Sequence, residues 1–460
     1  MELKEQKRKV IFSVVLISTI ISSFLSTALN TALPQLMNDY QLSAATGQWV
    51  TSIYSLVMGI AVLATAYLVK KIPTKKLYLA SLVIFAVGLL MDGLNMPFSI
   101  FMVGRILQAI SNGVLLALTQ VIVLTIFPVE KRGTYMGIYG LAAGVAPVVA
   151  PTLAGIIIDL AGWRMIFFST LVMMIALIIV SIVVFEDVLE NENLKFDFAS
   201  LAFCAVGYTG ILLALGNIST YGVISINVLL PFIFGLVGAI IFVYRQLHST
   251  EPFLDVKILK VREYRIAVIS SMLLYLGMMA ATILLPIYLQ NIRGYSATTS
   301  GLVMIPGSLI MAVVSPMIGK MYDKFGIKKI FIVGAVLQII GYVGMGTFND
   351  NTSIIYITVM QTILNIAIGF LMMPLATWGM STILQDKTSD GTSLLTSLRT
   401  VAGSVGTAVF VGIMTVVGNF SSQIKGLSVT FICLAAIAII ELLIAIFAVH
   451  EKSEPVNVIS

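Results

Sequence analysis

The sequence contains few of the side chains on which covalent catalysis and metal binding usually depend. It has two histidines and two cysteines in 460 residues, and only 10% of its residues are charged. His248 and His450 both fall in hydrophilic segments, and no Gly-x-x-x-x-Gly-Lys-[Ser/Thr] sequence occurs. A metal cluster, a nucleophile motif and a phosphate-binding loop all lack support. We therefore predict that the chain is not an enzyme and uses no cofactor.

Apolar residues are abundant instead. They make up 59% of the chain, and the mean hydropathy is +1.04. A soluble core cannot hold that much apolar surface, so the lipid bilayer must solvate it. A spanning helix needs about 20 apolar residues. Apolar runs lie near residues 10–33, 47–69, 77–95, 98–127, 134–158, 164–185, 199–216, 225–244, 266–290, 297–318, 330–347, 354–380, 391–417 and 427–449. The pattern predicts an all-α integral membrane protein with fourteen transmembrane helices.

The net charge of +6 comes from lysines and arginines in the short gaps between these runs. Because they form no single basic stripe, they indicate membrane topology and not nucleic-acid binding. With a cytoplasmic N-terminus, twenty-two of them fall inside, and only Arg164, Arg293 and Lys425 fall outside. Positive charge concentrates on cytoplasmic loops. We therefore predict a multi-pass protein of the cell membrane with both termini in the cytoplasm.

The gaps between the runs divide the chain into three parts. The longest, near 186–198 and 245–265, bracket one pair of helices. We predict a six-helix bundle over 1–190, an inserted helix pair with its flanking loops over 191–262, and a second six-helix bundle over 263–460. The loops at 70–76 and 319–329 occupy matching places in the two bundles. Two such halves are what a rocking transporter needs, with its site between them near the midplane of the bilayer.

Three of the predicted spans carry one polar face each. Arg105 lies well inside the fourth span, where an arginine costs a few kcal/mol unless it faces protein or water. The other polar residues that share a helix face are Gln108, Asn112 and Thr119 in the fourth span, Ser18, Ser22, Ser26 and Asn30 in the first, and Gln361 and Asn365, above Met372, in the twelfth. These faces predict a shared aqueous cavity. The alternative is interhelical hydrogen bonding that only holds the bundle together.

The fifth span carries small and helix-bending residues along one side. These are Gly133, Gly137, Gly140, Gly144, Pro147, Pro151 and Gly155. Small residues let another helix approach closely, and proline bends a helix by removing a backbone hydrogen bond. We expect a helix that packs tightly and also flexes. The alternative is the glycine packing that is ordinary in membrane proteins.

Three of these segments resemble motifs of the fourteen-helix drug:proton antiporters of the major facilitator superfamily, and the likeness runs from about residue 24 to 410. Residues 140–155 resemble the antiporter motif, whose positions are here Gly140, Gly144, Pro147, Pro151 and Gly155. Gly104-Arg105-Ile-Leu-Gln108 resembles the family's helix-four motif, whose arginine is implied in proton coupling. The 319–329 loop, with Gly319, Asp323, Lys324 and Gly326, resembles the superfamily's gating loop, in which Asp323 and the basic residues would latch the inward side.

The sequence departs from this family in two places. In the first copy of the gating loop, Lys70 stands where the family has Asp and Pro73 where it has Gly, so we do not expect a latch there. The first span lacks the acid that many relatives carry before Asn30. We therefore assign proton coupling to Asp92 and Glu441, the acids inside predicted spans, together with Arg105, and expect Asp92 and Arg105 to pair. The alternatives are a membrane-interface role for Asp92 and a structural hydrogen bond for Glu441.

The cargo site is expected to be large and adaptable. Methionine, aromatic and amide side chains can repack around varied ligands. The residues expected to line it are Ser26, Asn30, Tyr54, Gln108, Asn112, Tyr139, Tyr275, Met279, Gln361, Asn365, Met372 and Trp378. The resemblance implies proton-coupled efflux of amphipathic, often cationic drugs. The alternative is a dedicated exporter or symporter of one metabolite or lipid precursor. The expected partners are small-molecule drugs, protons and the lipid bilayer, with no nucleic acid; the sequence gives no oligomeric state.

Overall fold

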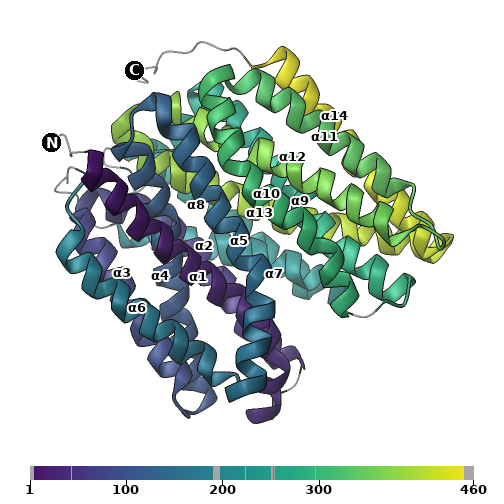
Figure 1. The fold of residues 1–460 in the computed structure, drawn as a ribbon, viewed down its shortest axis with the longest axis horizontal. Coiled ribbons are helices and arrows are strands. Elements are labelled where there is room, and N and C mark those ends of the chain that lie inside the picture. The colour runs from purple at the N-terminus through teal and green to yellow at the C-terminus, as the bar shows by residue number, and fades with distance from the viewer. Residues whose placement is uncertain are drawn as a thin grey trace.

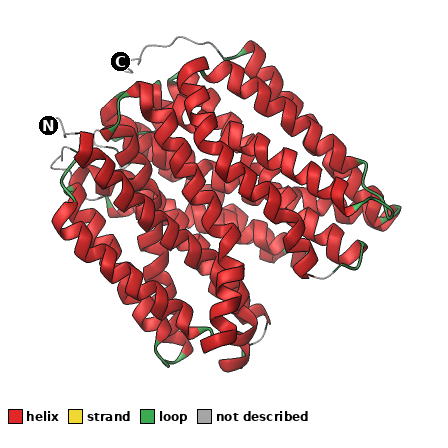
Figure 2. Ribbon diagram, viewed as in Figure 1, coloured by secondary structure: helices red, strands yellow, loops and turns green. Residues whose placement is uncertain are grey.

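The structure, a computed structural model, describes residues 5–42, 44–189, 197–222, 224–249, 252, 254–295 and 297–449. Inside its helices, the side chains of residues 27, 30, 31, 34, 44–49, 51, 52, 143–149, 151, 152, 219–221, 297 and 298 lie outside the description. The described residues form helices joined by short loops, without a strand among them (Figure 2).

Fourteen long α-helices account for nearly all of the described chain, which confirms the predicted fold class. They are α1 (Glu5–Asp39), α2 (Ala44–Lys71), α3 (Thr74–Gly93), α4 (Phe98–Ile126), α5 (Val129–Ala161), α6 (Arg164–Val184), α7 (Phe198–Tyr221), α8 (Ile226–His248), α9 (Arg262–Ile287), α10 (Ala297–Phe325), α11 (Ile327–Gly346), α12 (Ile354–Ser381), α13 (Thr388–Phe420) and α14 (Gln423–Phe447). Three short turns, η1 (Val256–Lys260), η2 (Tyr288–Ile292) and η3 (Gln385–Lys387), lie beside α9 and α13. Within the described residues, thirteen of these helices are long and apolar enough to cross a membrane; α5 is only partly described.

The helix ends follow from local sequence. Pro73, Pro97 and Pro128 precede the first residues of α3, α4 and α5, because proline cannot donate the backbone hydrogen bond that a helix interior needs. Ser353 accepts a hydrogen bond from the backbone N–H of Ile355 and so caps α12. Gly326, with φ of 74°, adopts the left-handed conformation that separates α10 from α11.

The helices form two groups of six with a pair beside them. We call α1–α6 the N half and α9–α14 the C half. Figure 1 shows the first residues of α1 and the last residues of α14 at the same end of the molecule, where the two halves converge, and shows the halves diverging toward the opposite end. The predicted topology makes the converging end cytoplasmic. Large apolar side chains cover the outside, with Val183 81% and Phe447 73% exposed, as expected of a surface that lipid solvates.

Helices α7 and α8 pack on each other through glycine. A Cβ atom on Gly210 would lie 2.5 Å from Gly235 Cα, so these two backbones touch directly. The pair also contacts the N half, because the ring of Tyr208 fills the space above Gly59 of α2. Much of α8 is exposed, including Phe234 at 59%, so this helix faces lipid.

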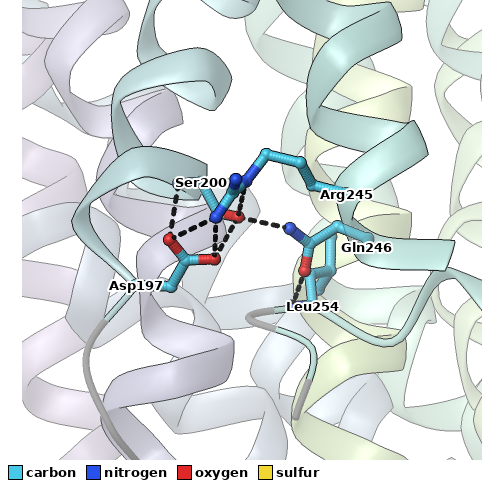
Figure 3. Close-up of polar contacts among 5 residues, drawn as sticks. All are labelled: Asp197, Ser200, Arg245, Gln246 and Leu254. Carbon is cyan, nitrogen blue, oxygen red and sulfur yellow. Dashed lines mark hydrogen bonds and ion pairs between the residues drawn. The ribbon is translucent and has the colours of Figure 1, made fainter. Parts of the chain in front are cut away.

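A polar cluster holds the base of the α7–α8 pair to the segment that leads into α9 (Figure 3). Asp197 accepts hydrogen bonds from the N–H and hydroxyl of Ser200, at 3.0 and 2.5 Å, and from Arg245 at 3.1 Å. Burial opposes ionisation of Asp197, but these bonds outweigh it and hold its pKa below the usual range. Buried Gln246 donates to the Ser200 hydroxyl at 2.8 Å and accepts from the Leu254 N–H at 3.0 Å. The helix pair is therefore tied to Leu254 by a directed bond.

Candidate functional site

The cytoplasmic end of the interface between the halves is a crossing of α5 and α10. A Cβ atom on Gly319 would lie 2.3 Å from the Gly133 carbonyl oxygen, and one on Gly137 would lie 2.6 Å from the Ser315 carbonyl oxygen. A Cβ atom on Gly140 would lie 2.7 Å from the Met373 side chain of α12. The glycine face expected from the sequence is thus the face that meets the C half. The packing of Gly144, Pro147 and Pro151 lies outside what the structure describes.

Asp323 of α10 fastens this crossing. Its carboxylate accepts hydrogen bonds from the backbone N–H groups of Gly133 and Thr134, both at 2.9 Å, and from the Thr134 hydroxyl at 2.5 Å. These donors lie in the second turn of α5, and hydrogen bonds to an ionised carboxylate are stronger than those between neutral groups. Lys324 points elsewhere, with its ammonium 5.2 Å from the Phe325 ring. Of the four gating-loop residues, Asp323 and Gly319 therefore contact the N half.

A second fastening joins α2 to α13, where we had not expected one. Lys70 forms an ion pair with Asp390, which is fully buried in the first turn of α13. The Asp255 N–H also donates to Asp390, at 3.2 Å, and Lys387 pairs with the Asp255 carboxylate at 3.0 Å. The expectation that the 70–76 loop holds no latch contact is wrong for a simple reason. The loop carries the cation, and the opposite half supplies the acid.

Among the described residues, the glycines at the opposite ends of α5 and α10 make no such contact. A Cβ atom on Gly155 or Gly301 would have no neighbour within 4 Å. Gly155 therefore does not extend the tight helix contact that Gly133, Gly137 and Gly140 make. Together with the divergence of the halves in Figure 1, this defines a conformation that is closed at the cytoplasmic end.

Asp92, Gln108 and Arg105 form a hydrogen-bonded chain inside the N half. Arg105 donates to the Gln108 side-chain oxygen at 2.6 Å, and the Gln108 amide donates to Asp92 at 2.9 Å. The guanidinium lies 4.2 Å from the centre of the Tyr54 ring, and the Tyr54 hydroxyl accepts from Asn112 at 2.8 Å. The expected association of Asp92 with Arg105 thus runs through an amide and not through direct contact. The second Asp92 oxygen, Oδ1, is buried without a partner.

Glu441 lies in a different place, between α14 and α11 of the C half. It is fully buried, and neither carboxylate oxygen has a hydrogen-bond partner. Gln338 and Tyr342 of α11 are its polar neighbours, and their side-chain polar atoms also lack partners. The three residues form a buried polar group away from the contact between α5 and α10.

Tyr139 and Tyr275 flank a residue that the sequence analysis missed. Arg399 of α13 is 4% exposed, and its guanidinium carbon lies 4.8 Å from the centre of the Tyr275 ring. Its charge also acts on the hydroxyl of Tyr139, which accepts a hydrogen bond from Gln120 at 3.3 Å. These residues come from α4, α5, α9 and α13, so both halves contribute.

The other expected cavity residues are spread over the interface and the cores. Met279 lies against Gly403 of α13, and Met372 packs against the apolar cores of both halves. Asn365 donates to the Gln361 carbonyl at 3.0 Å, and the Gln361 side-chain oxygen is buried without a partner. Trp378 belongs to the core of the C half.

The serines of α1 bond within their own helix. Ser18, Ser22 and Ser26 donate to the carbonyls of Val15, Thr19 and Ser23, respectively. Their hydroxyls are thus satisfied locally. The side chain of Asn30 lies outside the described residues.

The missed residues left unequal signals in the sequence. Arg399 lies as deep in the predicted span at 391–417 as Arg105 does in its own, so the same cost argument applies to it. Gln120 follows Thr119 and continues the run of polar residues in the fourth span. Asp390 gave no signal, because it stands at a span boundary, where charged residues are common.

This arrangement of two six-helix halves around a shared interface is that of a membrane transporter. The family model described as Major Facilitator Superfamily matches residues 15–407. The chain therefore belongs to the major facilitator superfamily, whose members are transporters and not enzymes.

Individual relatives agree with this assignment. The lincomycin resistance protein LmrB of Listeria monocytogenes is 32% identical over 382 residues, which are 83% of this chain and 81% of that protein. The riboflavin transporter RibZ of Clostridioides difficile is 28% identical over 381 residues, which are 82% of each. The crystal structure of the human organic anion transporter MFSD10 aligns with a TM-score of 0.71 at 14% identity, over 96% of this chain and 100% of that one, and shows the fold alone.

Proposed function

We propose that this protein exports small amphipathic drugs from the cytoplasm in exchange for protons, by alternating access. Similarity to a lincomycin resistance protein supports a drug as cargo. The observation that carries the proton part is the buried chain from Asp92 through Gln108 to Arg105. A carboxylate that is buried inside a membrane bundle and connected to a cation is a suitable site for reversible protonation.

The hydrogen-bonded residues Asp92, Gln108 and Arg105 suggest how protonation acts on the interface between the halves. Ionised Asp92 accepts from Gln108, which in turn holds Arg105 over the Tyr54 ring. Protonation removes the negative charge that balances Arg105, so the guanidinium keeps its bond to Gln108 but becomes a buried cation without a counter-charge. Tyr54 and Asn112 are its neighbours and would respond first. We propose Asp92 as the coupling site on this ground, and Glu441, which has no such connection to a cation, as a second site of protonation.

Entry of cargo from the cytoplasm requires both latches to open. Asp323 holds α10 to α5, and Lys70 holds α2 to Asp390 of α13. We propose that binding of cargo and proton release at Asp92 shift the balance between the closed and open states of this end. One proton that moves down a potential of about 100 mV supplies about 2.3 kcal/mol, enough for roughly fortyfold accumulation of a neutral cargo.

Transport in everted membrane vesicles tests this proposal. Uptake of a fluorescent drug should follow an imposed pH gradient and stop when a protonophore is added. Asp92→Asn should abolish gradient-driven uptake while exchange without a gradient continues. Asp159→Asn, an exposed acid at the far end of α5, is the matched control. Uptake that continues unchanged after the protonophore is added would refute proton coupling. Full activity of Asp92→Asn would show that Asp92 takes no part in the coupling.

A dedicated cargo is the second candidate, because a riboflavin transporter is also a relative. A competition panel in the same vesicles separates the two. A multidrug exporter should be inhibited by several unrelated amphipathic compounds, lincomycin among them. Inhibition by a single compound class would favour the dedicated carrier.

A further inference from the structure

Arg399 is a buried cation that the proposed coupling mechanism does not use. It lies on α13 at the interface between the halves, beside Tyr275 of α9 and within electrostatic reach of Tyr139 of α5. Only 4% of its surface is exposed, and its Nε is buried without a hydrogen-bond partner. Among the described residues, no carboxylate lies within ion-pair distance of it.

The other buried charges near the interface are compensated. Arg105 is connected to Asp92 through Gln108, Asp390 is paired with Lys70, and Asp323 is held by the N-terminal end of α5. A buried charge is normally retained only when it is paired or has a function that requires it. Arg399 has aromatic faces and small residues around it, including Gly403 one turn along the same helix.

The surroundings of Arg399 are suited to an anion. A guanidinium presents N–H donors in a planar fork that matches the two oxygens of a carboxylate. The Tyr139 hydroxyl accepts from the Gln120 amide and can donate its own hydrogen, so it adds a neutral donor from the N half, and Met279 adds an apolar, adaptable wall. These groups together can hold a molecule with one acidic group and an apolar or aromatic body.

We propose that Arg399 binds the anionic group, a carboxylate, of the transported cargo. This inference rests on the proposed export function and narrows its substrate class from amphipathic drugs in general to amphipathic acids and zwitterions. The cargo carboxylate is then the missing partner of Arg399. Because α13 belongs to the C half and Tyr139 to the N half, a cargo bound here touches both moving parts.

Binding to purified protein tests this assignment separately from transport. The probes are a panel of aromatic carboxylic acids, such as the zwitterionic fluoroquinolone norfloxacin, each measured beside its methyl ester. Wild-type protein should bind the acids about tenfold or more tightly than their esters. Arg399→Gln should lose that preference, and Arg399→Lys should keep part of it, since it retains the charge without the planar fork. Arg262→Gln, an exposed arginine beside Glu263, is the control and should bind as wild type does.

Thermal unfolding distinguishes a binding role from a structural one. If Arg399 serves the cargo, Arg399→Gln should unfold at or above the wild-type temperature, and an acid should raise the unfolding temperature of wild type only. A lower unfolding temperature of Arg399→Gln with equal effects on acids and esters would overturn the proposal. So would a wild-type protein that prefers no acid over its ester. Selective acid binding without gradient-driven uptake would leave Arg399 in place and refute the export function instead.

Discussion

The ion pair between Lys70 and Asp390 gives the sharpest test of how the cytoplasmic end closes. Asp390 is fully buried at the start of α13, and Lys70 is its strongest partner; the Asp255 N–H, at 3.2 Å, is the other. Lys70→Met removes the ammonium while keeping an unbranched side chain of similar length. The closed state then contains a buried carboxylate without a counter-charge, whereas the open state exposes that carboxylate to water.

The expected effect is large. Removing one partner of a buried ion pair costs about 3 to 5 kcal/mol, and the lower figure is appropriate here because 12% of the Lys70 side chain is accessible. About 3 kcal/mol shifts the closed-to-open ratio by roughly a hundredfold. Asp390→Asn should shift it in the same direction. The double variant should lie closer to wild type than the two single effects predict, by at least about 1 kcal/mol, because neither charge is then left alone.

Distance measurements between the halves provide the assay. Spin labels at Lys76→Cys and Lys329→Cys, both exposed on the cytoplasmic end, would report its opening by electron paramagnetic resonance, in a background without Cys204 and Cys433. Lys71→Met is the control, because Lys71 is the exposed neighbour of Lys70 and its cation–π contact is with Tyr67 of its own helix. Unchanged distances in both single variants, or strictly additive effects in the double variant, would refute the latch.

Other predictions concern the contacts that support this closure. Gly319→Val should prevent closure and abolish transport, because its Cβ would lie 2.3 Å from the Gly133 carbonyl oxygen. Gly155→Ala is the control and should transport as wild type does, because its Cβ would meet nothing within 4 Å. Normal transport by Gly319→Val would contradict the tight crossing. Gln246→Leu should lower stability by about 1 to 3 kcal/mol, since it leaves the Leu254 N–H and the Ser200 hydroxyl with fewer partners in a buried place; thermal unfolding measures this, and an unchanged unfolding temperature would contradict it. Acidification should weaken the same cluster only below the usual titration range of aspartate. The pKa of Asp197 is lowered in the folded protein, so its contribution is present above the unfolded pKa and is lost as pH falls through the folded one; pH-dependent unfolding of wild type and Asp197→Asn measures it, and a loss already complete near neutral pH would contradict it.

The number and extent of the helices were predictable because the signal is local. Each span needs its own run of apolar residues, and fourteen runs became fourteen helices. The glycine stripe of α5 was informative for a similar reason, since a face of small residues must meet another backbone. Its partner was not readable. Gly133 meets Gly319, and nothing in the spacing of either helix specifies the other.

The candidate site was harder to predict, because its contacts join residues that lie far apart in sequence. Lys70 and Asp390 are separated by 320 residues, and each looked unremarkable beside its own helix end. Arg399 differs, since its position in an apolar span was itself a signal. Ser18 and Ser22 illustrate the opposite error. They share a helix face, yet their hydroxyls bond to carbonyls of the same helix.

The two latches follow one plan with the charges exchanged. Lys70 occupies the place in the 70–76 loop that Asp323 occupies in the 319–329 loop, and each points at the first turns of a helix in the opposite half. At α5 the backbone N–H groups of Gly133 and Thr134 and the Thr134 hydroxyl supply the donors, so an acid suffices. At α13 the first turn already contains Asp390, whose carboxylate the helix end favours, and only a cation from α2 can complete the contact. An aspartate at position 70 would therefore place two acids together, whereas Lys70 forms the ion pair with Asp390 that closes this contact.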